Sequence, residues 1–286
     1  MKYDIITDIK TVLTLLDLSS SQLADELGVA RSTVIRILNK QTYPSDLFLE
    51  SFYSYAYTNK HRQIRLNDLK IQFCKDKYNR ILFHGAKDEI VMPIDLNHSR
   101  KQIDVGVGFY LGESYEQASS YIFANKKSCV YLFDSFYLDS LKVKELSVSL
   151  EWMLMVCYYR EQIDRFKNSK KVQNIIKEIE ECDVVIAPIA DNNMYELMGQ
   201  FARGLITDEQ AISALSASSL GKQHVIKSQR ACYAISPVDR LYLCEAERRD
   251  IEKKQMMAAQ LASDKYKLAI ENNRRKGKYI EELLNE

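Results

Sequence analysis

Two short segments place a polar aromatic side chain beside glycine. His84 and Gly85 follow a short apolar run, and Tyr110 comes shortly after Gly106 and Gly108. A histidine ring can hydrogen-bond a hydroxyl group, and glycine leaves backbone N–H and C=O groups uncovered for a planar amide. Two strands that carry such residues predict a binding site for a ligand with both kinds of group.

Two further side chains suit the same ligand. Tyr110 and Tyr121 lie eleven residues apart and can present two flat faces to an aromatic ring. Gln223 begins a late strand, where its amide can hold a sugar hydroxyl. A purely structural interpretation stays open, because a histidine at a strand end often serves only its neighbours and the chain has 18 tyrosines.

The composition favours a soluble globular protein of the cytoplasm. Of the 286 residues 46% are hydrophobic, enough for a sizeable core, and a net charge of +1 indicates no general affinity for polyanions. The sequence shows no signal-peptide pattern and no apolar run of about 20 residues, so we expect no membrane partner. The six cysteines lack the spacing of a zinc or redox site, which predicts buried thiols and no metal.

Residues 1–58 have the apolar spacing of consecutive short helices. Ser19 and Gln22 form a capping-box pattern at the start of the second helix, and Gly28 suits the turn that ends it. A third helix is expected over residues 29–38. A helix, a glycine turn and a second helix predict a helix-turn-helix domain over residues 1–58.

Residues 22–34 resemble the phage-repressor-like helix-turn-helix family. The resemblance implies that the third helix enters the major groove of DNA, with Val34 and either Ile37 or Leu38 facing the core. The DNA-binding side chains would then be Arg31, Ser32, Thr33 and Arg36. Alternatively the domain is a scaffold that contacts only its neighbour, because residues 1–45 hold five basic and five acidic side chains and attract phosphate weakly.

Residues 59–79 are predicted to form a basic linker. Between residues 59 and 80, seven basic side chains outnumber two acidic ones. A charge run of this kind is usually a solvated helical linker, which is the interpretation we favour, but it could also line a path for nucleic acid.

Residues 80–237 mix short strands with helices. The expected strands cover residues 80–84, 107–111, 129–136, 142–146, 183–188 and 224–227. The expected helices cover residues 114–123, 150–165, 193–203 and 207–215. The last of them begins with a capping-box pattern of Thr207 and Gln210. This pattern predicts an α+β fold. Residues 238–286 predict a charged helical segment, helical from residue 239 to the end, that braces the surface or docks on a partner chain.

The order of the motifs resembles the three-part signature of the diphtheria-toxin and poly(ADP-ribose)-polymerase class of ADP-ribosyltransferases. Its parts are His84-Gly85, then Gly106 to Tyr110 with Tyr121 downstream, then residues 222–226. Over residues 80–236 the chain is more closely similar to uncharacterised bacterial ADP-ribosyltransferase-like domains of toxin–antitoxin and phage-defence settings. The resemblance implies a split antiparallel β-sheet with helical insertions and a C-terminal helix, and NAD⁺ as a substrate without a metal.

The resemblance also implies a role for each matched position. His84 would hydrogen-bond the adenosine ribose, and the Gly85 backbone would pair with the nicotinamide carboxamide. Tyr110 and Tyr121 would enclose the nicotinamide ring. Gln223 completes the catalytic set with His84 and Tyr110. It would hydrogen-bond the 2′-hydroxyl of the nicotinamide ribose, where the class usually has glutamate.

Two positions depart from the class. Gln223 can make that hydrogen bond but cannot supply negative charge or act as a base, and Ala118 stands where the polymerases have serine. The departures favour a single ADP-ribose transfer over polymer synthesis. Another carboxylate could come from Asp191, Glu196 or Glu151. We prefer Asp191, although it is also well placed to cap the helix that follows it.

These patterns predict a mono-ADP-ribosyltransferase, a toxin or defence effector, that modifies a macromolecule. The basic residues 59–80 favour nucleic acid over protein as the acceptor. The alternative is a DNA-binding transcriptional regulator whose ADP-ribosyltransferase-like domain binds NAD⁺ without catalysis. In either case the C-terminal helix could dock a small antitoxin-like protein.

Overall fold

The protein is represented by a computed structural model that describes residues 1–58, 65–100, 102–136, 140–218, 220–274 and 276–285. The chain forms two compact units. The first contains residues 1–90, 118–135 and 236–253, and the second contains residues 91–117, 136–235 and 254–286. Both helices and strands are present, and the N-terminal region is helical, so the prediction of an α+β fold with a helical beginning is confirmed.

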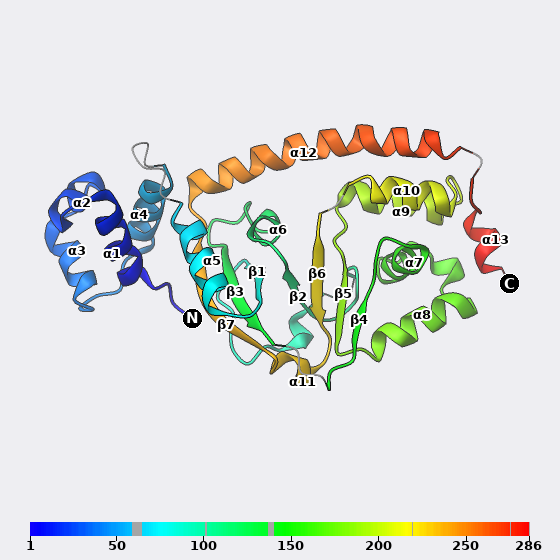
Figure 1. Cartoon of the computed structure of the whole chain (residues 1–286), viewed down its shortest axis with the longest axis horizontal. Helices are drawn as coiled ribbons and strands as arrows, with labels where there is room; N and C mark the ends of the chain where they lie inside the picture. Colours follow the sequence, from blue (N-terminus) through cyan, green and yellow to red (C-terminus); the bar gives the residue numbers. More distant parts are fainter. Residues whose placement is uncertain (59–64, 101, 137–139, 219, 275, 286) are drawn as a thin grey trace. The chain divides into compact units, whose positions relative to one another are not determined.

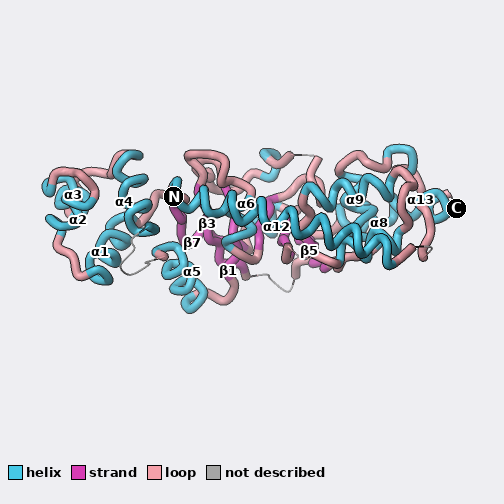
Figure 2. Tube along the Cα trace, turned by 90° about the horizontal axis from the view of Figure 1, so that it is seen from above, coloured by secondary structure: helices cyan, strands magenta, loops and turns pink. Residues whose placement is uncertain are grey.

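The first unit begins with an all-helical group, in which Figure 2 shows no strand. Its helices are α1 (Ile5–Leu16), α2 (Ser20–Glu26), α3 (Arg31–Leu38) and α4 (Asp46–Thr58). The predicted capping box of Ser19 and Gln22 is confirmed at the start of α2. Gly28 has a φ of +65°, a left-handed conformation that glycine adopts without strain and that lets α3 begin after a short turn.

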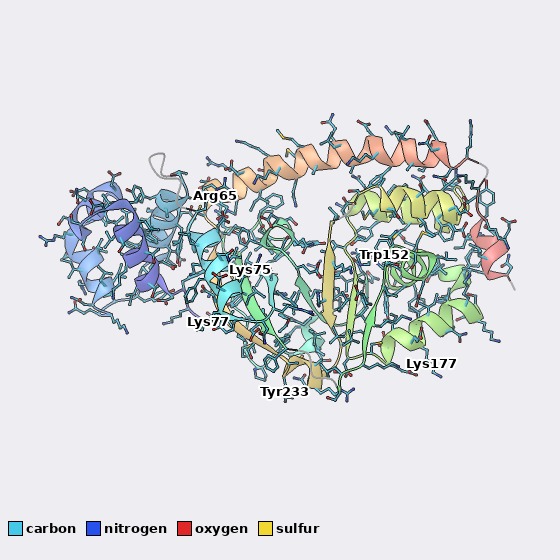
Figure 3. The ribbon with its side chains drawn as sticks, viewed as in Figure 1. Arg65, Lys75, Lys77, Trp152, Lys177 and Tyr233 are labelled. Carbon is cyan, nitrogen blue, oxygen red and sulfur yellow. The ribbon has the colours of Figure 1, made fainter. Side chains whose placement is uncertain are left out.

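Helix α5 (Leu66–Lys77) lies in the predicted basic linker and also belongs to the first unit. Leu66, Ile71 and Cys74 are buried, while Lys75 and Lys77 are exposed (Figure 3). One face of this helix is therefore packed, and only the other face is solvated. The rest of the predicted linker, residues 59–64, lies outside the described residues.

Lys70 on the packed face of α5 joins four segments of the first unit. Its Nζ lies 3.1 Å from Asp8 Oδ2 on α1 and 3.3 Å from Asp239 Oδ1, and the Tyr53 hydroxyl on α4 donates to Asp8 Oδ2 at 2.6 Å. Burial opposes the charged form of Lys70, but the carboxylates of Asp8 and Asp239 raise its pKa above the usual value. This ion cluster fastens the helical group to the strands of the same unit.

The strands of the first unit follow one another in the order β1 (Ile81–Ala86), β3 (Cys129–Ser135) and β7 (Ile235–Tyr242). In the antiparallel pair of β1 and β3, His84 lies opposite Tyr131 and Gly85 opposite Val130. Strand β7 corrects the prediction of helix from residue 239. This strand contains Pro237 and is the last strand in the order of the sheet. A strand at the edge of a sheet tolerates proline, because the N–H that proline lacks can face away from the neighbouring strand.

The strands of the second unit have the order β4 (Val143–Glu145), β5 (Val184–Pro188), β6 (Lys222–Ile226) and β2 (Phe109–Gly112). β4 and β5 are parallel, whereas β5 with β6 and β6 with β2 are antiparallel. Each of the six predicted strands is present, with its ends shifted by a few residues.

Helices gather beside these strands in Figure 1. They are α7 (Leu150–Tyr159), α8 (Lys170–Glu180), α9 (Asn192–Ala202) and α10 (Asp208–Ser216). Trp152 on α7 is fully buried among them (Figure 3). The prediction missed α8, and the helix expected over residues 150–165 is shorter because Glu161 has a φ of 58°. The capping box of Thr207 and Gln210 is confirmed.

The remaining elements are short apart from one. They are η1 (Leu96–His98), α6 (Tyr115–Ser120), η2 (Asp164–Phe166), α11 (Gln229–Cys232), α12 (Glu245–Asn272) and α13 (Ile280–Leu284). Two of them, α12 and α13, form most of the predicted C-terminal helical segment. The six cysteines are buried free thiols, as predicted. None of the described helices combines the length and the apolar character that a membrane crossing needs.

Replacing Lys70 by methionine should destabilise the first unit strongly, because the buried Asp8 and the half-buried Asp239 would be left without their cation. We expect the free energy of unfolding to fall by about 3–5 kcal/mol, measured by urea denaturation. Lys75→Met on the exposed face of the same helix is the matched control and should change it by less than about 0.5 kcal/mol. Equal effects of the two substitutions would contradict this account of the ion cluster.

Acid should weaken the second unit at Asp183. This carboxylate accepts from Arg230 Nε and Ser228 Oγ, each at 2.6 Å, and the Arg230 guanidinium is the main reason that the pKa of Asp183 is far below its usual range. Its stabilising contribution is therefore complete above about pH 5 and declines as the pH falls. Asp183→Asn should lower the Tm at pH 7 and reduce the further loss between pH 5 and 3. Asp164→Asn, at an exposed position, should have the same acid profile of Tm as the unsubstituted protein. Identical profiles for all three proteins would refute the stabilising role of Asp183.

Candidate functional site

His84, Gly85 and Tyr121 belong to the first unit. A Cβ atom added to Gly85 would collide with the carbonyl oxygen of Ala118 and would lie 3.1 Å from Ile122 Cγ2. The chain around Tyr121 therefore passes directly over Gly85, which gives that glycine a packing role in addition to its predicted contact with a ligand. His84 is half-buried, and the Tyr121 side chain is 59% exposed.

Tyr110 and Gln223 belong to the second unit and share one face of a strand pair. Tyr110 on β2 lies opposite Val225 on β6, and Gln223 lies opposite Gly112. Side chains of directly opposed residues point to the same face, and residues two apart along a strand do so as well. These two residues of the predicted catalytic set are thus diagonal neighbours on the same face.

The Tyr110 hydroxyl is engaged by the loop that precedes its own strand. It donates to Gly106 O at 2.6 Å and accepts from Val105 N at 3.1 Å. Gly106 has a φ of +71°, so the loop needs glycine at this position. Burial raises the pKa of Tyr110 above its usual value. The hydroxyl fixes the loop, and the partly buried ring packs against the hydrophobic core of the second unit.

The Gln223 side chain is buried and anchored at its amide nitrogen. Nε2 donates to Asp104 Oδ2 and to Pro188 O, each at 3.3 Å. Pro188 ends β5, the strand on the other side of β6. Both amide protons of Gln223 therefore have acceptors inside the protein.

Asp104 is the main residue that the sequence interpretation missed. It is 3% exposed, and its Oδ1 accepts from Arg160 Nε at 3.0 Å, from the terminal nitrogen of Arg160 at 2.7 Å and from the Tyr195 hydroxyl at 2.8 Å. The Arg160 guanidinium also stacks on the Tyr195 ring at 3.9 Å from its centroid. Asp104, Arg160, Tyr195 and Gln223 form one network, which we call the Asp104 network.

The spacing of residues in the sequence could not predict this network. Arg160 is the C-terminal cap of α7, Tyr195 lies on α9 and Gln223 on β6, so the partners of Asp104 are 56 to 119 residues away. The one local signal is that an acidic residue directly precedes the segment Val105 to Gly108.

The three carboxylates considered from the sequence have other partners. Asp191 accepts from Met194 N at 2.9 Å and caps α9, so the alternative interpretation of this residue is confirmed. Glu196 pairs with Arg203 at 2.9 Å, and Glu151 pairs with Lys144 at 2.5 Å. The carboxylate that lies beside Gln223 is Asp104.

Two more polar residues position the loops around this face. Gln117 Oε1 accepts from the backbone of Glu113 at 2.7 Å, and its Nε2 donates to Leu220 O just before β6. Lys227 Nζ donates to Val105 O at 2.8 Å and to Val107 O at 3.4 Å. Burial lowers the pKa of Lys227. These residues tie the segments before and after β2 to the two ends of β6.

The predicted DNA-contacting face is on the surface of the first unit. On α3, Val34 and Ile37 are buried in the helical core, and Leu38 is half-buried. The predicted contact residues are exposed apart from the half-buried Thr33; they are Arg31, Ser32, Thr33 and Arg36. Within the part of the chain that the structure describes, no group of histidine, cysteine and acidic side chains could hold a metal ion.

Comparison with known proteins adds a family assignment. Neither the search of curated proteins nor the search of solved structures found a match. A family model described as "Protein of unknown function (DUF3990)" matches residues 80–236, which is more than half of the chain and includes β1, β2, β6 and the Asp104 network. The protein therefore belongs to the DUF3990 family.

Proposed function

We propose that this protein is an NAD⁺-dependent mono-ADP-ribosyltransferase that modifies a macromolecule. The observation that best supports the proposal is the common face of β2 and β6, where Tyr110 and an anchored Gln223 are diagonal neighbours. An aromatic ring beside a fixed polar side chain suits a nicotinamide riboside, which joins a flat cationic ring to a ribose with two hydroxyls. The mostly antiparallel strands agree with the split sheet that the resemblance implies.

The proposed chemistry depends mainly on position. His84 would hydrogen-bond the adenosine ribose, the Gly85 backbone would hold the carboxamide, and the rings of Tyr110 and Tyr121 would enclose the nicotinamide. Gln223 would accept a hydrogen bond from the nicotinamide ribose. The bond between ribose C1′ and the nicotinamide nitrogen breaks, and its electron pair leaves with neutral nicotinamide. A lone pair of the acceptor then forms the new bond to C1′, and the proton that the acceptor loses passes to solvent.

Gln223 limits the proposed reaction to one transfer. Its amide is neutral, so it can orient a hydroxyl but cannot remove a proton from the next ribose in a growing polymer. Cleavage itself has less need of a carboxylate, because the leaving ring already carries a positive charge that is neutralised as the bond breaks.

The acceptor we favour is nucleic acid, and the setting is that of a cytoplasmic toxin or defence effector held silent by a small antitoxin-like protein. Exposed basic side chains occur on two helices of the first unit, Arg31 and Arg36 on α3 and Lys75 and Lys77 on α5. Such side chains supply the phosphate contacts on which nucleic-acid binding depends.

Two features favour a second function: the exposed Arg31 and Arg36 on α3, which could contact DNA, and the neutral Gln223, which cannot act as a base. In this alternative the protein is a DNA-binding transcriptional regulator, and the DUF3990 region binds NAD⁺ without transferring ADP-ribose. The two functions differ in one measurable property, the release of nicotinamide.

Purified protein incubated with NAD⁺ and a mixture of RNA, DNA and lysate proteins should release nicotinamide, measured by chromatography. His84→Ala and Tyr110→Ala should each reduce kcat/KM at least about tenfold, a loss of about 1.4 kcal/mol in transition-state stabilisation. Tyr110→Phe keeps the ring and should retain more activity than Tyr110→Ala. Glu196→Gln, which removes an exposed ion pair, is the control and should match the unsubstituted enzyme. Tight NAD⁺ binding without any turnover would reject the enzyme and favour the regulator.

Binding of duplex DNA should depend on α3. We expect Arg31→Ala and Arg36→Ala each to weaken binding and to reduce the slope of log K against log salt by about one, as loss of one phosphate contact does. Fluorescence anisotropy between about 50 and 200 mM salt measures both quantities, and Arg203→Ala at the C-terminal cap of α9 is the control. Binding that is absent, or unchanged by both substitutions, would indicate that α3 has no DNA-contacting role.

A further inference from the structure

The Asp104 network determines which end of the Gln223 amide can meet a ligand. The amide nitrogen is committed to two acceptors, Asp104 Oδ2 and Pro188 O. Neither a carboxylate nor a carbonyl can donate a hydrogen bond, so the amide oxygen would gain nothing by turning towards them. Oε1 must therefore point away from Asp104 and act as an acceptor.

Asp104 is itself held in one orientation, so that the same carboxylate oxygen always faces Gln223. Its Oδ1 is occupied by Arg160 and by the Tyr195 hydroxyl, which leaves Oδ2 for Gln223. A carboxylate this deeply buried needs each of these partners. Arg160, the Tyr195 hydroxyl and Gln223 Nε2 thus all donate to Asp104, which is the acceptor in each of these contacts.

We propose that Asp104 is a positioning residue of the transferase, which fixes Gln223 so that Oε1 accepts a hydrogen bond from a ribose hydroxyl of NAD⁺. This inference rests on the proposed function. In it, Asp104 and Gln223 together replace a single glutamate: Gln223 supplies the acceptor oxygen, and Asp104 orients it without touching the substrate.

The proposal makes a specific statement about restoring glutamate. Gln223→Glu would bring a second carboxylate to within about the same distance of Asp104 as the amide nitrogen it replaces, and two adjacent carboxylates cannot both ionise easily. We therefore expect nicotinamide release at about pH 8 to fall about tenfold rather than rise, and to recover partly as the pH is lowered towards about 6.

Asp104→Asn should fail for a different reason. The side-chain oxygen of the introduced asparagine would stay with Arg160 and Tyr195, so its amide group would face Gln223 as a donor. To accept from it, the Gln223 amide would turn its oxygen inward and give up the hydrogen bond from Nε2 to Pro188 O. A donor would then face the ribose, and nicotinamide release should fall about tenfold with little change in its pH profile.

The double variant, Asp104→Asn with Gln223→Glu, restores one donor and one acceptor between positions 104 and 223, while Pro188 O loses the donor that Gln223 supplied. The introduced glutamate can accept from the introduced asparagine with one oxygen and present the other to NAD⁺. Release should therefore recover about tenfold over either single variant, without the pH dependence of Gln223→Glu. A general loss of structure would make the double variant worse than both single variants. Additive losses would therefore overturn the proposal, as would full activity of Asp104→Asn.

Thermal unfolding separates failure of this inference from failure of the proposed function. If the unsubstituted protein neither binds NAD⁺ by calorimetry nor releases nicotinamide, the transferase proposal fails. The hydrogen bond between Gln223 and Asp104 is still tested in that case. Relative to the unsubstituted protein, the Tm of Gln223→Glu should fall as the pH rises from about 5 to 8, and the Tm of the double variant should not. Parallel Tm profiles for all four proteins would refute the pairing itself.

Discussion

Burial of the Asp104 carboxylate is the constraint on which the arrangement of the second unit depends. A carboxylate removed from water is tolerated only where its oxygens are paired. The donors come from the end of α7, from α9 and from β6, so the position of the loop before β2 depends on all three elements. The same hydrogen bonds that compensate for the buried charge also determine the orientation of Gln223. Stability and the geometry of the candidate site therefore have a common origin.

In the first unit, the charge enclosed by the fold is a cation rather than a carboxylate. Lys70 lies between Asp8 and Asp239, and through them α5 is fixed to α1 and to β7. A basic helix that would otherwise be a solvated connection thus becomes part of the packed interior. The exposed basic residues on α3 and α5 consequently belong to one compact unit.

Close backbone approaches complete the candidate site. Gly85 has no room for a side chain beneath Ala118, and a Cβ atom at Gly108 would lie 2.6 Å from Val225 Cγ1 on β6. The glycines beside His84 and Tyr110 are therefore required by packing whether or not a ligand binds. Each unit thus holds its own candidate residues in place by packing, which suits the proposed transfer, a reaction that would depend mainly on position.

The sequence by itself determined the features that depend on neighbouring residues. The capping boxes at Ser19 and Thr207, the glycine turn at Gly28 and the six strands could be read from it, because caps, turns and apolar alternation act over a few residues. It could not reveal β7, because a proline and charged residues are unusual in a strand, although an edge strand tolerates them. Nor could it reveal the partner of Gln223. Asp104 is 119 residues from Gln223 and 56 from Arg160. Only tertiary packing brings these side chains together and removes water from them, and that burial makes Asp104 the common acceptor of Arg160 and Gln223 and so fixes the orientation of the Gln223 amide.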